Sequence, residues 1–348
     1  MTRLECSALR CLAIMSILLH NFAHCLPDTA KENEFYLEIE NYEFFWKSVF
    51  GTDFIIQILS HFGHLGVPVF VFLTGYGLAQ KYDSMEHLDW KCFLFRHWKK
   101  LFVPLVVGVL AYYSVTFVME GHLIRPVSMI IKQCTMLLNY LSPMDIHPMP
   151  YWYLGMTMQL YVVYLLFVYK RTIVPLLLLA IASLIFMACQ ADHFSYVVMS
   201  KFNCIGWLAP LCMGIAFSRY QSKVHVERGI RLMGASVISL VLVLLCGFNF
   251  YTWLLIPLFV VIMSVGVVKY VPVSFQKKMD FIGKNSLYLL IVHPITRVLI
   301  VPLIPSLGGY ISMIIYICIT VVVVYGFLNK NLVFRSLIRT FAGDYDNG

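Results

Sequence analysis

The sequence alternates between apolar runs of helical length and short polar segments. Many of these runs contain about 17–21 residues, the length that crosses the ~30 Å hydrocarbon layer of a bilayer as an α-helix. The pattern predicts an all-α, polytopic membrane helix bundle with about ten transmembrane helices. We place the spans near residues 8–26, 62–80, 101–119, 151–169, 172–190, 203–219, 231–248, 250–268, 285–303 and 309–328.

The composition agrees with a membrane protein. Hydrophobic residues make up 60% of the 348 residues and charged residues only 13%, against roughly 25% charged residues in soluble domains. Because the predicted spans occupy nearly the whole chain, we expect a single integral membrane domain over residues 1–348. The net charge of +8 does not indicate a nucleic-acid partner, since the basic residues gather in short loops on one side.

The distribution of charge predicts the orientation in the membrane. Acidic residues gather in segment 28–53 on one side, and the positive-inside rule places the opposite, basic side in the cytoplasm together with both termini. We expect an outer loop over residues 27–61, a cytoplasmic basic loop over 81–100 and an interfacial or partly re-entrant segment over 122–145. The basic side carries Arg3, Lys81, Lys91, Arg96, Lys99, Lys100, Lys170, Arg171, Lys223, Arg228, Arg231, Lys269, Lys277, Lys278, Lys284, Lys330, Arg335 and Arg339.

Ten cysteines are scattered along the chain, and several lie within apolar runs. None forms a Cys-x-x-Cys pair, so we expect thiols packed as small apolar groups and no disulfide framework. The first apolar run follows Arg3, but no small-x-small cleavage site comes after it. We therefore expect this run to be retained as a membrane span and not removed as a signal peptide.

The first span carries the most unusual polar residues, namely Arg10, His20, Asn21 and His24. In an α-helix His20, Asn21 and His24 lie about 80°, 20° and 40° around the axis from Arg10, with His20 ~15 Å along it. Ionisable groups at membrane depth usually face the interior of a bundle and mark a functional site. The alternative is a histidine pair at the headgroup level of the outer membrane surface.

Other spans contribute further candidates, each with a structural alternative. His64 and Thr74 belong to the second span, whose small residues also suit close helix packing. Arg96, Lys99 and Lys100 could hold the phosphates of an anionic cosubstrate, although the positive-inside rule alone explains them. Ser286 is a plausible helix cap, and His293 lies in the middle of a span, where it could be a buried core histidine.

The chain resembles the acyltransferase-3 family of integral membrane acyltransferases, which mostly modify glycans, lipid-linked saccharides or peptidoglycan. The resemblance covers nearly the whole chain and preserves the order of the motifs. The segments that carry it are LRCLAI followed by His20, HLGVPVFVFLTGYGL from His64, the Arg96-x-x-Lys99 pair before a proline, YWYLGMTMQLY around Trp152, and GKNSLYLLIVHP ending at His293 and Pro294.

The resemblance implies roles for individual residues. Arg10 and His20 match the functional Arg and His of the family's first span, and Arg96 and Lys99 match its cytoplasmic Arg-x-x-Arg motif. The lysine keeps the charge but loses bidentate phosphate geometry. Many members place the histidine eleven residues after the arginine, a position held here by Asn21, so His20 is the first choice and His24 the second.

The chemistry of acyl transfer agrees with these residues. A base must take the proton of the acceptor hydroxyl, and a neutral imidazole suits that task near pH 7. We expect an O-acyltransferase that uses acetyl-CoA or another acyl-CoA as cosubstrate, with acyl groups passing through the bundle to a glycan or lipid-linked saccharide outside. We expect no metal and no resident cofactor. A proton-coupled transporter with buried histidines, or a glycan-binding bundle without turnover, remains an alternative.

Overall fold

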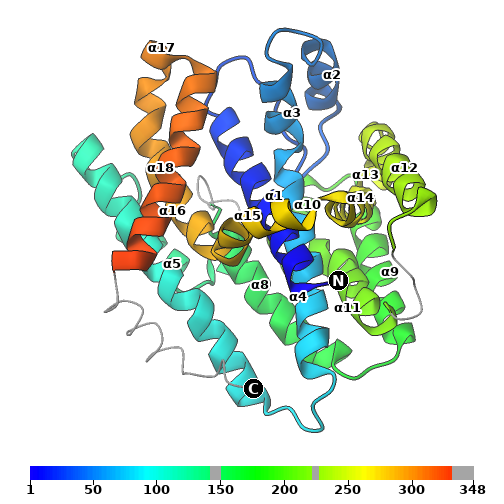
Figure 1. Cartoon of the computed structure of the whole chain (residues 1–348). Coiled ribbons are helices and arrows are strands. Elements are labelled where there is room, and N and C mark those ends of the chain that lie inside the picture. Colours follow the sequence, from blue (N-terminus) through cyan, green and yellow to red (C-terminus); the bar gives the residue numbers. More distant parts are fainter. Residues whose placement is uncertain (142–149, 222–226, 331–348) are drawn as a thin grey trace. The chain divides into compact units, whose positions relative to one another are not determined.

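A computed structural model describes residues 1–141, 150–221 and 227–330 of the chain (Figure 1). It is 80% helical, and no strand occurs in the described residues, which confirms the predicted all-α class. The chain divides into two compact units. The first consists of Met1–Glu86 with Val162–Ser286, and the second of His87–Tyr161 with Leu287–Gly348.

The first unit is built around α1 and α4, which pack against each other. α1 also packs on α15, α4 on α11, and α12 on α14 (Figure 1). The helices of this unit are α1 (Arg3–Ala23), α2 (Ile39–Ser48), α3 (Phe54–Phe62), η1 (Gly63–Leu65), α4 (Gly66–Tyr82), η3 (Tyr164–Val168), α9 (Ile173–Cys189), α10 (Phe194–Phe202), η4 (Cys204–Trp207), α11 (Leu208–Tyr220), α12 (Ile230–Cys246), α13 (Phe250–Trp253), α14 (Ile256–Tyr270) and α15 (Val273–Lys284).

Small residues allow the close approach of these helices. A Cβ atom on Gly66 would lie 2.3 Å from the Ala13 carbonyl oxygen of α1, and one on Gly75 would lie 2.3 Å from the Leu211 carbonyl oxygen of α11. Both distances are far below van der Waals contact, so only glycine fits at either position. The prediction that glycines of the second span serve helix packing is confirmed at Gly66 and Gly75.

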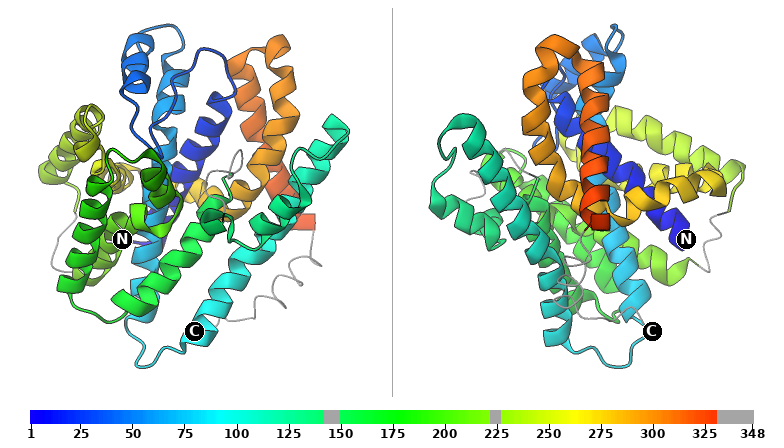
Figure 2. Two further views of the ribbon diagram at one scale, coloured as in Figure 1. Left: turned by 180° about the vertical axis from the view of Figure 1, so that it is seen from behind. Right: turned by 60° about the vertical axis from the view of Figure 1, so that its left-hand side comes forward.

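In the second unit, α16 and α18 run side by side, as both views of Figure 2 show. The hydroxyl groups of Thr296 and Thr320 are hydrogen-bonded between them at 2.6 Å. The Tyr151 hydroxyl donates to the Ile291 carbonyl oxygen of α16 at 2.8 Å. The helices of this unit are α5 (Trp90–Glu120), α6 (Val127–Cys134), α7 (Leu138–Leu141), α8 (Trp152–Val163, which ends in the first unit), α16 (Ser286–Ile300), η5 (Val301–Leu303), α17 (Ile304–Leu307) and α18 (Gly309–Lys330).

Each of the ten predicted spans is largely helical, but the helices differ in length and some spans contain more than one of them. Among the described residues, five helical segments are long and apolar enough to cross a membrane, and a sixth is added if α10 and the η4–α11 segment, bent by 70°, form one broken span. The five are Arg3–Ala23, Phe54–Tyr82, Trp90–Glu120, Ser286–Leu307 and Gly309–Leu328. Four shorter apolar helices are Trp152–Val168, Ile173–Cys189, Ile230–Cys246 and Ile256–Tyr270. Ten crossings and cytoplasmic termini therefore stay predictions.

Two of the expected loops contain helical residues. α2 and α3 lie within the expected outer loop 27–61, and α3, which begins at Phe54, continues through η1 into α4. Within the expected basic loop 81–100, α5 begins at Trp90, where the Asp89 side chain caps the helix by accepting hydrogen bonds from two backbone N–H groups. The positions of both loops relative to the membrane stay predictions.

Three further expectations can be compared with the structure. Residues 122–145 contain the two short helices α6 and α7 in their described part. All ten cysteines lie in the described residues as free thiols, of which Cys6, Cys11, Cys212 and Cys246 are buried and Cys92, Cys189 and Cys318 are exposed. Lys223, Arg335 and Arg339 of the predicted basic side lie outside the described residues.

Candidate active site

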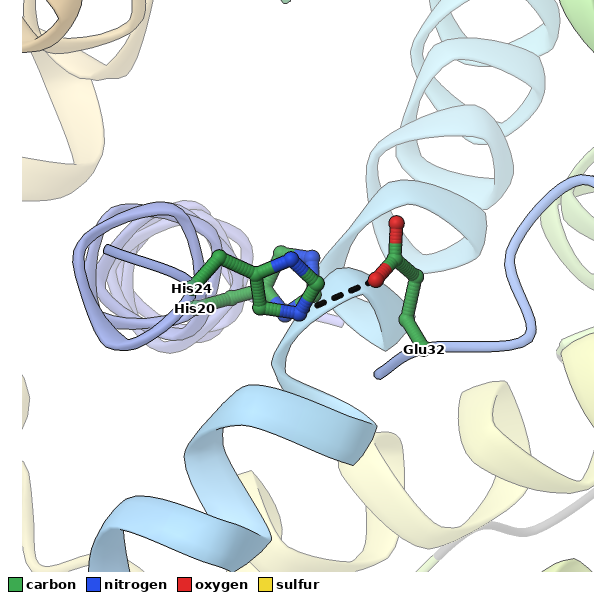
Figure 3. A group of neighbouring side chains, drawn as sticks. All are labelled: His20, His24 and Glu32. Carbon is green, nitrogen blue, oxygen red and sulfur yellow. Dashed lines mark ion pairs between the residues drawn. The ribbon is translucent and has the colours of Figure 1, made fainter. Parts of the chain in front are cut away.

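Two imidazoles lie together at the C-terminal end of α1. His20 and His24 are one helical turn apart, and their ring centroids are separated by 4.3 Å. Figure 3 shows both side chains projecting from the same side of the helix toward Glu32, which lies on a different segment of the chain. Gly63 of η1 lies against this turn, since a Cβ atom there would come within 2.5 Å of the His20 Cβ.

Hydrogen bonds assign different protonation patterns to the two rings. The His20 Nδ1 lies 3.3 Å from the Leu59 carbonyl oxygen, which can only accept. We therefore place a proton on Nδ1, which leaves the Nε2 lone pair available as a base. The His24 Nε2 lies 2.9 Å from the Ser60 carbonyl oxygen and 3.0 Å from the Glu32 carboxylate, so it is the donor of that ring.

Glu32 provides the negative charge of this group. Burial alone would raise the pKa of the Glu32 carboxyl, but the hydrogen bond and charge of His24 outweigh burial and hold that pKa well below its usual range. Glu32 is therefore ionised near neutral pH. A carboxylate that accepts a hydrogen bond from an imidazole orients the ring and stabilises its charged form.

Residues of α3 hold the loop that carries Glu32. The Gln57 side chain accepts from the Ala30 N–H at 2.8 Å and donates to the Asp28 carbonyl oxygen at 3.0 Å. The Ser60 hydroxyl donates to the Ala30 carbonyl oxygen at 2.7 Å, and the His61 Nδ1 lies 2.6 Å from the Lys31 carbonyl oxygen. Residues immediately before Glu32 are thus fixed to a helix, and the carboxylate is held in place beside His24.

A third imidazole connects this group to a cavity. The His64 ring lies 5.6 Å from the His20 ring, and its buried Nδ1 has no hydrogen-bond partner among the described residues. The cavity contains about 480 Å³ of empty space, its open mouth included. Its wall is mainly apolar, with Phe62, Leu65, Pro68, Ile256 and Pro257, and it also contains Asn33, Glu34, Tyr42, His61, His64, Lys201, Trp207 and Trp253.

The same group could hold a metal ion, which the sequence did not suggest. His20, His24 and Glu32 each offer one ligand atom, and these atoms all lie within 4.8 Å of one another. Two imidazoles and one carboxylate are a ligand set that Zn²⁺ accepts. The carboxylate already binds His24, so the observed contacts equally describe an acid–base group without a metal.

The remaining predicted residues of the first unit bind their own helices or lie apart from the imidazoles. The Asn21 side chain donates to the Ile17 carbonyl oxygen at 2.9 Å, and the Thr74 hydroxyl donates to that of Phe70 at 2.9 Å. Arg10 is partly buried and lies ten residues before His20 in α1, about 15 Å along the axis. These contacts agree with structural roles for Asn21 and Thr74.

Of the other predicted residues, Ser286 is the last residue of the first unit and the rest belong to the second unit. The Lys99 ammonium lies 5.7 Å from the centre of the Phe95 ring near the start of α5. Arg96 lies in the same part of α5, one helical turn after Cys92. His293 is fully buried in α16, with Nδ1 3.3 Å from the Leu289 carbonyl oxygen. Ser286 is the first residue of α16, as predicted to within one position. The other members are Lys100, exposed in α5, and Trp152, buried in α8.

Sequence reasoning did not single out Glu32 or Lys201. Glu32 is one of several acidic residues in segment 28–53, and nothing in its spacing from His24 distinguishes it. Lys201 has a weak signal, because a lysine inside the aromatic and apolar stretch from Phe194 to Trp207 is unusual. Such a lysine is expected to be paired or functional.

Comparison with known proteins identifies the family. Searches of curated proteins and of solved structures gave no match. The sequence model of a family described as Acyltransferase domain, Acyl_transf_3, matches residues 5–328, which include both the imidazole group and the apolar helices. Together with the multi-pass set of apolar helices, this match shows that the chain is a membrane acyltransferase of the acyltransferase-3 family.

Proposed function

We propose that the protein transfers an acetyl or other acyl group from acyl-CoA to a hydroxyl of a cell-envelope glycan or lipid-linked saccharide at the plasma membrane. The observation that carries the proposal is the group of His20, His24 and Glu32, in which one imidazole has an available lone pair and its neighbour is paired with a carboxylate. The family match supports an acyl donor and an acceptor in general terms.

In the proposed reaction His20 acts as general base. Its Nε2 takes the proton of the acceptor hydroxyl while the hydroxyl oxygen forms a bond to the thioester carbonyl carbon. The carbon–sulfur bond then breaks, and the proton passes from His20 to the CoA sulfur. Glu32 stabilises the imidazolium that forms, because its carboxylate lies within 4.8 Å of the His20 ligand nitrogen.

We assign donor binding to the basic residues at the start of α5. Arg96 and Lys99 are three residues apart in a helix, so their side chains share a face, and exposed Lys100 follows them. Cations on one helical face suit the phosphates of CoA. We further propose that Arg10, in the same helix as His20, orients the acyl donor.

The proposal is tested by thiol release from acetyl-CoA with purified protein in nanodiscs, with and without a cell-envelope glycan extract. Wild type is compared with His20→Ala, His24→Ala and the control His122→Ala, which alters an exposed histidine outside the imidazole group. We expect release that requires the extract, is lost in His20→Ala and is unchanged in His122→Ala.

Two results would change the proposal. Loss of release in His24→Ala alone would make His24 the base and leave the reaction class intact. Neither acetyl-CoA binding nor release by the folded wild type would contradict acetyl-CoA as donor. Separately, Arg96→Ala should raise the KM for acetyl-CoA with little change in kcat, because it removes ground-state binding.

A further inference from the structure

Lys201 is a buried cation in the wall of the cavity beside His64. Its side chain is 3% exposed. The ammonium nitrogen lies 4.4 Å from the centre of the Trp253 ring and 5.0 Å from that of Trp207, and both rings line the same cavity. Cation–π contacts of this kind stabilise an ammonium group but offer no negative charge.

Among the described residues, the Lys201 ammonium donates no hydrogen bond and forms no ion pair within 4.0 Å. Glu34, which lines the same cavity, is the acidic group that acts on Lys201. The Glu34 carboxyl nevertheless lies more than 4.0 Å from the Lys201 ammonium nitrogen, so the lysine has no counter-ion in contact with it within the described part of the chain. The Glu34 side chain can itself hydrogen-bond a hydroxyl group of a ligand.

The protein holds Lys201 in this position by local packing. The Trp207 indole N–H donates to the Lys201 carbonyl oxygen at 2.6 Å, and the Trp253 indole N–H donates to the Asn33 carbonyl oxygen at 2.9 Å. A Cβ atom on Gly206 would lie 3.0 Å from both the Cα and the Cδ of Lys201. A buried charge fixed so firmly is costly unless a partner neutralises it.

We propose that this cavity binds an acidic sugar, with the carboxylate or phosphate of the sugar paired to Lys201 and one of its hydroxyl groups directed toward His64. Aromatic rings can pack on the apolar faces of the sugar, and Asn33 and Glu34 can hydrogen-bond its other hydroxyls. His64 lines the cavity, and its ring centroid lies 5.6 Å from that of His20, so a hydroxyl held at His64 is one imidazole ring away from the proposed base. The assignment of the bound sugar as the acyl acceptor rests on the proposed function. The binding of the sugar to this cavity does not.

The test is a binding measurement by titration calorimetry on the full-length protein in phosphatidylcholine nanodiscs, without an acyl donor. The probes are methyl glucuronide, glucose 1-phosphate and the neutral methyl glucoside. We expect both acidic probes to bind wild type at least about tenfold more tightly than methyl glucoside, because a buried charge pair is lost with the neutral sugar. Equal affinities for acidic and neutral probes would overturn the proposal, and this comparison needs no variant.

Two variants locate the charge. Lys201→Met keeps the length of the side chain without its charge and should reduce acidic-probe binding at least about tenfold with little effect on methyl glucoside. Lys47→Met, which removes an exposed lysine of the same unit, should change neither. Unchanged acidic binding in Lys201→Met would overturn the assignment of Lys201, and thermal melting in nanodiscs establishes that each variant is folded.

One further measurement distinguishes an acidic sugar from a lipid headgroup as the ligand of the cavity. Adding phosphatidylglycerol to the nanodiscs should leave binding of the acidic sugars unchanged. If phosphatidylglycerol instead abolishes it, the anion recognised by Lys201 is a lipid phosphate, and the acidic-sugar proposal is wrong. Because the assay contains no acyl donor, failure of thiol release leaves its outcome unaffected. Conversely, acyl transfer that occurs only to neutral sugars would contradict this inference and not the acyltransferase activity.

Discussion

Glu32→Gln removes the negative charge of the imidazole group while keeping the size of the side chain. In the proposed reaction His20 becomes an imidazolium, and the Glu32 carboxylate lies within 4.8 Å of its ligand nitrogen. At that distance, with an effective dielectric constant of about 20, the attraction is worth about 3.5 kcal/mol, or roughly 300-fold in rate. We therefore expect the kcat of Glu32→Gln to fall by two to three orders of magnitude.

The assay is acetyl-CoA thiol release with glycan extract in nanodiscs, analysed for kcat and KM separately. The KM for acetyl-CoA should be unchanged, because the charge acts on a group that becomes positive only during the reaction. Glu32→Asp should recover part of the rate, since it restores the charge at a slightly greater distance. Glu40→Gln, which removes an exposed carboxylate from α2 of the same acidic segment, is the matched control and should be fully active.

The reasoning is refuted if Glu32→Gln keeps a kcat within about threefold of wild type while its melting temperature is unchanged. A fall in rate that accompanies loss of folded protein would instead show that Glu32 fixes the outer loop. The two cases are separated by thermal melting, and by whether Glu32→Asp restores rate, stability or both.

Three other predictions concern stability. Gly75→Ala should destabilise the protein by about 1–3 kcal/mol, because the added Cβ would lie 2.3 Å from the Leu211 carbonyl oxygen. The control is Gly77→Ala in the same helix, whose Cβ would meet nothing within 4 Å and which should be neutral or stabilising. Equal melting temperatures for the two variants would contradict the packing argument. Asp83→Asn should cost about 1.5–3 kcal/mol, because Asp83 accepts from the Arg219 Nε at 2.6 Å and from the Tyr164 hydroxyl at 2.9 Å, while exposed Asp192→Asn should not change thermal melting. Glu34→Gln should gain stability relative to wild type as pH rises from 4 to 8. Burial and the charge of Glu32 raise the pKa of Glu34, so the stability that protonated Glu34 contributes is complete below the pKa of the unfolded chain, near 4.5, and is lost as pH rises through the pKa of the folded protein. A difference in melting temperature that stays constant across this range would show that the folded pKa of Glu34 is not raised.

Much of the fold follows from local sequence pattern. All ten predicted spans are largely helical, because a helix satisfies the backbone hydrogen bonds of an apolar run within one segment, although span 250–268 is divided between α13 and α14. The spacing of His20 and His24 also determined that their rings share a face, since four residues make about one helical turn. Glycines at 66 and 75 pointed correctly to close helix packing.

Local pattern was less informative where tertiary contacts set the boundaries. Gln57, Ser60 and His61 fall within the expected outer loop 27–61, and in the structure they belong to α3. Their polar groups are satisfied by the backbone of residues 28–31, which a sequence does not reveal. Gly77 resembles its neighbour Gly75 in sequence, but it meets no helix.

By itself, the sequence determined the helical class, the membrane character and the histidine pair, because each depends on residues within a few positions of one another. Only the tertiary structure decided which groups complete the site. Glu32 reaches His24 from a loop fixed by α3, and Lys201 joins His64 at one cavity from more than a hundred residues away. Such contacts depend on how helices and loops pack, and no periodicity along the chain records that packing.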